Sequence, residues 1–300
     1  MGELTPPIVV AGMHRSGTAL VVDLLQNSGC FFGARLDPNQ EDFFFLLRNE
    51  WLMRRAGGAW DHPLPLLSFL SQPECFDSSL DFLRRHVRSP RFSRFTGYLA
   101  YFSGKWGRGA VRPWGFKDPR NTFTFPLWRR VFPGARLIYV RRNGVDVAES
   151  LRNRSLHQLR SIGKRPGILS LESLPRRLAR AVSSFESFDH QLHSSRCFSL
   201  QESFRLWEEY VEQGERLFEE YQGPKLALRF EELVTNTGEV FAQLASFCGL
   251  SGDQSPRADL IARVRPERAR AFLARDDLRE FYRSVQQTRW MRRLGYDALA

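Results

Sequence analysis

A short loop near the N-terminus has the composition of an anion-binding turn. An apolar run at residues 8–11 predicts a buried strand, and the apolar residues after the loop recur with the spacing of a helix. Between a strand and a helix, backbone N–H groups and the positive end of the helix dipole converge on one small anion. Gly12 and Gly17 permit a close approach that a side chain would block. The predicted anion loop consists of Gly12, Met13, His14, Arg15, Ser16, Gly17, Thr18 and Ala19.

The two glycines have the spacing of the phosphate loop of nucleotide triphosphatases, but the basic residue is displaced. Thr18 stands where a triphosphatase has the lysine that contacts the β- and γ-phosphates, and Arg15 supplies a cation earlier in the loop. A sulfuryl group carries one negative charge fewer than a phosphoryl group, so a metal-free loop with one cation near the leaving oxygen can suffice for it. The alternative is an ordinary turn between a strand and a helix.

A second strand-to-helix junction, at residues 141–150, has the residue types of another anion site. Arg142 stands at its entrance, and Ser150 and Arg154 are four residues apart, on one face of the predicted helix. We expect these three side chains to converge on a second phosphate; the alternative is that the arginines are solvated surface charges. Two such sites in one sheet indicate a ligand with two separated phosphate-like groups, such as a nucleotide phosphorylated on its 3' and 5' positions.

Strands that alternate with helices must position both loops. This alternation predicts an α/β fold with three layers, in which helices cover both faces of a central parallel sheet and ligands bind at the carboxyl ends of the strands. The expected strands lie at residues 8–11, 114–117, 135–140 and 225–230.

The remaining segments are read as helical additions to one domain that spans residues 1–300. Residues 40–103, which are rich in Phe, Leu and Arg, are expected to form helices packed around one edge of the sheet. Residues 155–199 show little strand signal and are interpreted as a mobile covering insertion that contains a helix. Helices are also expected at residues 202–221 and in a C-terminal extension at residues 251–300.

The charge balance points to an anionic partner. The formal net charge is +11, and only four of the 44 basic residues are lysines. Arginine binds phosphate in a bidentate geometry, so a nucleotide, a polyanion or an acidic membrane face would suit this chain. An arginine-rich genome composition is the alternative explanation.

Several classes of protein are disfavoured by the sequence. The four cysteines are scattered and predict neither a zinc site nor a disulfide framework. Aromatic residues such as Phe43, Phe44 and Phe45 follow apolar helical patterns, and no recognition helix is evident, so we expect no specific nucleic-acid partner. No apolar run has the length of a signal peptide or a membrane span. These features predict a soluble, cytoplasmic protein, for which peripheral membrane contact through a basic face stays open.

At this point the motifs resemble those of the sulfotransferase family that uses 3'-phosphoadenosine 5'-phosphosulfate (PAPS). Residues 15–18, Arg-Ser-Gly-Thr, are similar to its 5'-phosphosulfate loop, in the form found in tyrosylprotein and bacterial carbohydrate sulfotransferases. Arg142, Ser150 and Arg154 match its 3'-phosphate motif. Residues 116–119 resemble the segment whose lysine, here Lys117, faces the transferred group. Residues 228–233 resemble a Tyr-Glu-x-Leu signature, with Phe230 in the tyrosine's place.

The resemblance implies a P-loop-like sulfotransferase fold over residues 9–250, with PAPS as sulfuryl donor and no metal. It also implies that the loop from Gly12 to Ala19, the 3'-phosphate motif and Phe230 bind the nucleotide, and that Arg15 and Lys117 act in catalysis. Two features depart from the family. Phe230 lacks the hydroxyl of the tyrosine, and the Gly- and Lys-rich C-terminal loop of cytosolic members is not recognisable.

The general base is left open by the sequence. No histidine follows Lys117 as it does in the cytosolic enzymes, and the acceptor hydroxyl must lose a proton to a nearby side chain. The first candidates are three acids that follow the first helix, namely Glu41, Asp42 and Glu50. The next candidates are the acid after Lys117, Asp118, and the loop histidine, His14.

The acceptor is equally open. A carbohydrate, lipid, peptide or small metabolite with a hydroxyl or amine would serve, and the resemblance slightly favours a carbohydrate.

Two other functions compete with sulfuryl transfer. One is a P-loop nucleotide kinase or triphosphatase, which the missing lysine after Gly17 disfavours. The other is a non-enzymatic module that binds polyanions through its charge, and such binding would weaken steeply with salt.

Overall fold

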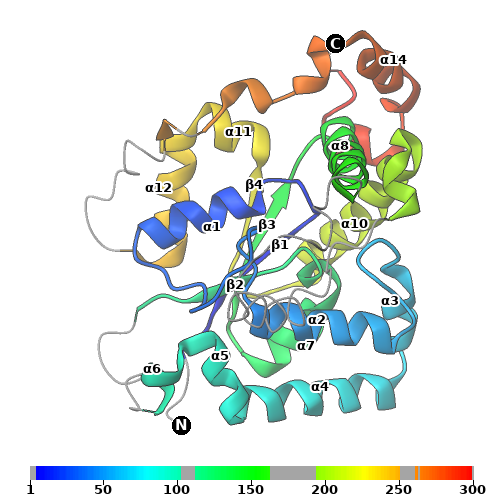
Figure 1. The fold of residues 1–300 in the computed structure, drawn as a ribbon. Helices are drawn as coiled ribbons and strands as arrows, with labels where there is room; N and C mark the ends of the chain where they lie inside the picture. Colours follow the sequence, from blue (N-terminus) through cyan, green and yellow to red (C-terminus); the bar gives the residue numbers. More distant parts are fainter. Residues whose placement is uncertain (1–4, 103–111, 163–193, 251–260, 263, 299–300) are drawn as a thin grey trace, which may run out of the picture.

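Four parallel strands form the centre of the fold. The computed structural model describes residues 5–102, 112–162, 194–250, 261–262 and 264–298. In these residues the strands lie in the order β2-β1-β3-β4, and every adjacent pair is parallel (Figure 1). The strands are β1 (Ile8–Gly12), β2 (Gly115–Lys117), β3 (Arg136–Arg141) and β4 (Lys225–Arg229). The predicted parallel sheet is therefore confirmed.

The strands are apolar on both sides because both faces of the sheet are covered. Val9 and Ala11 of β1 belong to one buried core, whereas Ile8 and Val10 belong to the other. This division follows from the two-residue period of a strand, which sends successive side chains to opposite faces. The sheet is thus the middle layer of three, as the alternation of strands and helices predicted.

Two sets of helices cover the sheet (Figure 1). The core on the first face takes its apolar side chains from α1 (Thr18–Asn27) and α12 (Thr237–Cys248). The core on the second face is larger and takes them from α2 (Phe43–Arg55), α7 (Asn121–Val131), α8 (Gly144–Ile162) and α10 (Leu200–Glu220).

Smaller elements surround these layers. After α2 come α3 (Leu64–Leu70), α4 (Pro73–Arg88), η1 (Pro90–Phe92), α5 (Ser93–Thr96) and α6 (Tyr98–Phe102). Next to α10 and β4 are η2 (Ser195–Phe198) and α11 (Phe230–Thr235). The C-terminal part has η3 (Pro266–Arg268), η4 (Ala271–Ala274), α14 (Asp276–Val285) and α15 (Arg289–Arg293). No helix of the described residues is long and apolar enough to cross a bilayer.

Most expected helices are present. Residues 40–102 form the helices that were predicted around one edge of the sheet, and the C-terminal extension is helical where it is described. The expected covering insertion begins differently, because residues 155–162 continue α8 instead of leaving it. Most of that predicted insertion, residues 163–193, lies outside the described residues.

Candidate functional site

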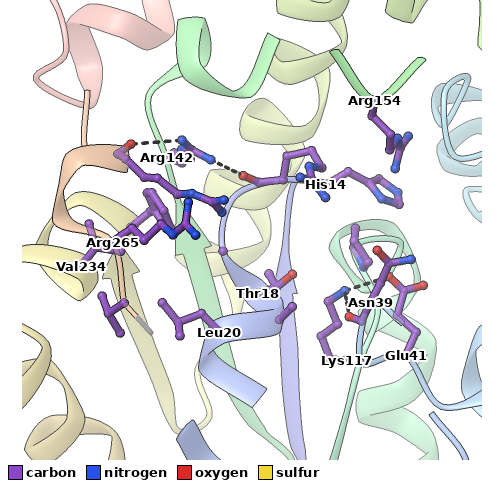
Figure 2. Close-up of a pocket in the computed structure, with 17 residues that line it drawn as sticks. His14, Thr18, Leu20, Asn39, Glu41, Lys117, Arg142, Arg154, Val234 and Arg265 are labelled. Carbon is purple, nitrogen blue, oxygen red and sulfur yellow. Dashed lines mark hydrogen bonds and ion pairs between the residues drawn. The ribbon is translucent and has the colours of Figure 1, made fainter. Parts of the chain in front are cut away.

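A pocket opens at the carboxyl ends of β1, β2 and β3. Its volume is about 310 Å³, and it lies where the loop after β1 meets the junction after β3 (Figure 2). Eight of the residues that were predicted to bind nucleotide line this pocket, together with Lys117 and Glu41. The eight are His14, Arg15, Gly17, Thr18, Ala19, Arg142, Arg154 and Phe230. The sequence motifs, which are spread from residue 12 to residue 230 of the chain, therefore meet in one cavity.

At two positions in the loop after β1, the backbone conformation and the close neighbours leave no room for a side chain. Gly12 has a φ of +137°, and a Cβ there would lie 2.5 Å from the carbonyl oxygen of Val140. Gly17 has a φ of +95°, and a Cβ there would clash with the Phe230 ring. Gly17 is also the N-cap of α1 and gives that helix no side-chain cap, so the first N–H groups of α1 stay available to an anion.

Two of the predicted loop residues support the loop and do not line the pocket. The Gly12 N–H donates to Thr122 Oγ1 at 3.2 Å, which ties the loop to α7. The Ser16 hydroxyl is buried and donates to the Met13 carbonyl at 2.6 Å. These bonds fix the loop conformation without a ligand.

The junction after β3 is held by a chain of buried polar contacts. Asn143 caps α8, since its Oδ1 accepts from the Val145 N–H at 2.9 Å. The Asn143 N–H donates to Glu231 Oε1 at 2.9 Å, and the Tyr296 hydroxyl donates to the other oxygen of Glu231 at 3.0 Å. Trp207 Nε1 donates to the Arg142 carbonyl at 3.0 Å. Glu231, the acid of the Tyr-Glu-x-Leu-like segment, thus positions the backbone beside Arg142.

Arg15 and Arg142 are in direct contact across the two loops. Arg142 Nη1 donates to the Arg15 carbonyl at 2.9 Å, and Arg15 Nε donates to Ser150 Oγ at 2.9 Å. The Arg142 guanidinium lies over the Phe230 ring, 4.1 Å from its centroid. Phe230 lacks the hydroxyl of the family's tyrosine, but its ring still packs against the Arg142 guanidinium and against Gly17.

Arg154 lies apart from Arg142, which differs from the expected convergence of three donors. Its guanidinium is 5.0 Å from the ring centroid of Trp60, on the His14 side of the pocket, whereas Arg142 lies on the other side of His14 (Figure 2). Arg142 and Arg154 both line the pocket, whereas Ser150, which accepts a hydrogen bond from Arg15, is not part of the lining.

Lys117 and Glu41 form a buried ion pair at the other side of the pocket (Figure 2). Lys117 Nζ lies 2.8 Å from Glu41 Oε1 and donates to the Asn39 carbonyl at 2.9 Å. Arg120 Nη2 lies 3.5 Å from the other Glu41 oxygen. Burial raises the pKa of the Glu41 carboxyl above its ordinary value, although Lys117 and Arg120 act in the opposite direction.

Of the five acids and histidines named as candidate bases, Glu41 and His14 line the pocket. Burial, and then the charge of Arg154, lowers the pKa of His14 well below its ordinary value, so the imidazole is neutral at physiological pH. His14 contacts Trp60 edge to face at 4.8 Å between ring centroids. Neutral His14 and carboxylate Glu41 are both chemically able to accept a proton.

The other three candidates have contacts of their own outside the pocket lining. Asp42 caps α2, and its Oδ1 accepts from the Phe44 N–H at 2.8 Å. Glu50 is paired with Arg54 on α2. Asp118 is fully buried and accepts from the side chain of Asn49 at 2.9 Å and from Arg120 Nε at 2.9 Å.

Sequence reasoning missed two cations of the pocket. Arg265 and Arg268 line it from the C-terminal part of the chain, and the Arg268 carbonyl accepts from Arg142 Nη2 at 3.2 Å. A turn with two arginines around Pro266 was the available signal, but in a chain with so many arginines it did not stand out.

The pocket is strongly cationic. Among the described residues, six cations line it against a single carboxylate, that of Glu41. Burial, followed by the charges of Arg154 and Arg142, lowers the pKa of Arg15 to about 10. Three buried nitrogens of the lining have no hydrogen-bond partner in the part of the chain that the structure describes, namely His14 Nε2, Arg142 Nε and Arg154 Nε. Lys117 is paired with Glu41, and Arg142 Nη2 lies 3.8 Å from Asp146 Oδ2 outside the lining, but cations remain in excess. This excess and the unpaired donors fit a polyanionic ligand.

The described residues contain no group of three or more His, Cys, Asp or Glu side chains arranged to hold a metal ion.

The chain thus combines a doubly covered parallel sheet with a cationic pocket at the carboxyl ends of its strands. A family profile described as "Sulfotransferase family" matches residues 6–201, and the chain belongs to this family.

Solved structures of bacterial sulfotransferases resemble the chain at low sequence identity. A sulfotransferase from Alicyclobacillus acidocaldarius is 17% identical, with 92% of this chain and 100% of that chain covered and a TM-score of 0.45. The sulfotransferase domain of the Synechococcus PCC 7002 olefin synthase is 16% identical over 95% and 90%, with a TM-score of 0.45. The sulfotransferase domain from the curacin biosynthetic pathway is 13% identical over 95% and 99%, with a TM-score of 0.48. A search of curated proteins finds no match.

Proposed function

We propose that the protein transfers a sulfuryl group from PAPS to a hydroxyl or amine of an acceptor. The observation that carries this proposal is the contact of Arg142 with the loop at Arg15, which sets two strand-to-helix anion sites side by side in one cationic pocket. A nucleotide with phosphate groups on its 3' and 5' sides matches two such sites. Membership of the sulfotransferase family supports the same reaction.

The pocket residues fit the donor in charge and in unused hydrogen-bond donors. The loop amides, Thr18 and Arg15 would hold the 5'-phosphosulfate, because the uncapped start of α1 lies there. Arg142 and Ser150 would hold the 3'-phosphate, with Arg268 beside them. The orphaned Nε of Arg142 supplies a donor for that phosphate. When bound, the donor supplies an activated sulfuryl group on a bridging oxygen.

The reaction would proceed by in-line attack of the acceptor oxygen on sulfur. The new bond joins the acceptor oxygen to sulfur, and the bond from sulfur to the bridging oxygen breaks, so that adenosine 3',5'-bisphosphate leaves. Negative charge grows on the bridging oxygen, and Arg15 and the loop amides are the groups placed to stabilise it. Lys117 would hold the oxygens of the moving sulfuryl group.

Glu41 is the base that the structure favours. It lines the pocket beside Lys117, and burial raises the pKa of its carboxyl, which makes it a better proton acceptor near neutral pH. The acceptor hydroxyl would give its proton to Glu41 as the bond to sulfur forms. His14 is the other lining residue able to take this role, whereas Asp42 serves as a helix cap in this proposal.

The acceptor side of the pocket would lie around Glu41, His14 and Arg154. Trp60 borders this side through its contacts with His14 and Arg154. An aromatic ring beside polar groups suits a carbohydrate ring as well as a phenol or a lipid headgroup, so we keep carbohydrate as the leading acceptor class.

Calorimetric titration with adenosine 3',5'-bisphosphate and with ATP tests the proposal without knowledge of the acceptor. We expect the bisphosphate to bind without magnesium and ATP to bind far more weakly. In Arg142→Ala the dissociation constant for the bisphosphate should rise about 10-fold or more, because a charge-assisted contact to phosphate is lost. Arg205→Ala, a change at an exposed residue of α10, is the matched control. Magnesium-dependent turnover of ATP, or bisphosphate affinity that Arg142→Ala leaves unchanged, would refute the assignment.

A further inference from the structure

One segment of the chain carries many cations and no carboxylate. Residues 82–102, from the second half of α4 to the end of α6, include no Asp or Glu. All five arginines of this segment are exposed, and none forms an ion pair with a carboxylate among the described residues. The five are Arg84, Arg85, Arg88, Arg91 and Arg94. Elsewhere exposed arginines such as Arg205 and Arg216 are paired with glutamates.

The electrostatic effect of these arginines reaches the residues beneath them. The pKa of Arg48 on α2 is lowered to about 10, first by burial and then by the charges of Arg94 and Arg91. Burial, together with Arg48, Arg91 and Arg85, also lowers the pKa of His86. The cations of this region therefore repel one another. Asp81 lines a shallow pocket with Arg84, Arg85 and Arg88, but the arginines outnumber it, and an external anion would relieve the repulsion.

The same segment ends in exposed apolar side chains. Tyr98 is 62% exposed, Leu99 is 89% exposed and Phe102 is 70% exposed, all on the short helix α6. The described residues expose six large apolar side chains, and three of them are in this single turn. Scattered exposed apolar residues are ordinary, but three together at the end of a segment with five exposed arginines indicate a binding surface.

This surface is separate from the transferase pocket. Helices α4, α5 and α6 lie together at the bottom of Figure 1, at the end of the sheet where the strands start. A hydrogen bond of 2.8 Å from the Ala34 N–H to the Phe95 carbonyl ties α5 to the chain there. The pocket is at the opposite ends of the strands, so nothing bound to this surface would block it.

We propose that this surface binds the headgroup region of an acidic lipid bilayer. The basic-apolar surface is defined by the five arginines together with Tyr98, Leu99 and Phe102. Arginines are attracted to anionic headgroups, while apolar side chains enter the boundary between headgroups and acyl chains. A soluble polyanion would satisfy the arginines and leave Leu99 and Phe102 in water, which is why a bilayer fits this surface better.

Co-sedimentation of the full chain with lipid vesicles tests this proposal. We expect binding to vesicles of phosphatidylcholine with phosphatidylglycerol, little binding to phosphatidylcholine alone, and weaker binding as salt increases. Each arginine removed from an acidic surface lowers the partition coefficient by about fivefold. The variant Arg84→Gln/Arg85→Gln/Arg88→Gln should therefore bind on the order of 100-fold less. The variant Leu99→Ser/Phe102→Ser should bind at least about 10-fold less.

Matched variants separate this surface from the general charge of the chain. Arg205→Gln/Arg216→Gln/Arg289→Gln removes the same number of exposed arginines elsewhere, and Leu64→Ser removes another exposed apolar side chain. Both controls should bind the acidic vesicles as the parent does, and thermal unfolding should show that every variant is folded.

Three outcomes would overturn the proposal. These are no binding to acidic vesicles, equal losses in the test and control variants, and an arginine-dependent retention on heparin with no effect of Leu99→Ser/Phe102→Ser on vesicles. The last result would identify a site for soluble polyanions. None of these results depends on whether the pocket transfers sulfuryl groups.

Discussion

Lys117 Nζ lies 2.8 Å from Glu41 Oε1, and the two side chains are only 3% and 6% exposed. This pairing joins the two residues that the proposed reaction requires at its centre, one for the sulfuryl oxygens and one for the acceptor proton. A buried lysine stabilises a nearby carboxylate. In the proposed reaction Lys117 turns toward the sulfuryl oxygens, so Glu41 loses part of that stabilisation and becomes a stronger base.

Substitution of Lys117 should remove catalysis and spare nucleotide binding. In Lys117→Ala we expect turnover to fall on the order of 100-fold or more, because a donor aimed at the reacting group is lost. The dissociation constant for adenosine 3',5'-bisphosphate should stay within about twofold, since that product lacks the sulfuryl group. Transfer of labelled sulfate and calorimetry measure the two effects. Arg120, 3.5 Å from Glu41, still compensates the carboxylate and helps the variant to fold.

A parental rate in Lys117→Ala would remove the lysine from the mechanism. Loss of bisphosphate binding together with turnover would instead indicate that Lys117 shapes the nucleotide site.

The pH dependence of transfer should report on Glu41. Burial raises the pKa of this carboxyl, and the base works only when it is ionised. The rate should therefore fall as the pH drops through a pKa above 4.5, the ordinary value for glutamate. In Glu41→Gln the rate should drop on the order of 100-fold or more and this acidic limb should vanish.

Glu50→Gln is the matched control, because Glu50 lies on α2 and is paired with Arg54 outside the pocket lining. Its profile of kcat/KM against pH should match that of the parent. If Glu41→Gln retained the acidic limb, the proton would go to another group, and His14→Gln would be the next variant to measure.

The sequence was sufficient to predict the sheet and the two strand-to-helix junctions that line the pocket, because these depend on local patterns. Strand burial on both faces gives continuous apolar runs, and the glycines at positions 12 and 17 reflect a backbone requirement that no distant residue changes. The contribution of Arg265 and Arg268 could not be predicted, since it depends on how the C-terminal part of the chain folds back over the site. The direction of Arg154 likewise depends on Trp60, which comes from a separate loop.

The difference between Glu41 and Asp42 also required the structure. The two acids are adjacent in the chain but differ in position. Asp42 is the N-cap of α2 and accepts from the Phe44 N–H, whereas Glu41 lines the pocket. Helix start signals include Asp, so this role was readable in principle. Which of two neighbouring acids faces the pocket depends on the path of the loop from Asp37 to Glu41, which the sequence pattern does not determine.

Replacement of Asp42 by asparagine should stabilise the protein at neutral pH. Burial raises the pKa of the Asp42 carboxyl to about 8, so the folded protein retains a proton that the unfolded chain releases. Stability from this group is therefore lost as the pH rises from about 4 toward about 8. An asparagine side chain would keep the cap and carry no charge. In Asp42→Asn the gain in the free energy of unfolding should grow by about 1 kcal/mol per pH unit in this window.

Urea unfolding across this pH range measures the gain, with Asp81→Asn, a change at an exposed acid on α4, as the control. The variant Asp42→Asn should also keep its transferase activity, because Asp42 lies outside the pocket lining. A gain that does not vary with pH would contradict the raised pKa, and a large loss of turnover would return Asp42 to the catalytic group.

Two glycines with nearly equal φ angles allow the contact of Gly17 with Phe230 to be measured separately from the strain of a positive φ. Gly17 has a φ of +95° and Gly29 has a φ of +98°, but only at Gly17 would a Cβ meet another group, the Phe230 ring. Both Gly→Ala variants should lose about 1 kcal/mol of unfolding free energy from the left-handed backbone. Gly17→Ala should lose more, and its affinity for adenosine 3',5'-bisphosphate should fall about 10-fold or more, because a displaced Phe230 releases Arg142. Phe230→Ala in the Gly17→Ala background should recover part of the lost stability through coupling of the two sites. Equal effects of Gly17→Ala and Gly29→Ala on both stability and affinity would show that the packing of Phe230 against the loop does not position Arg142.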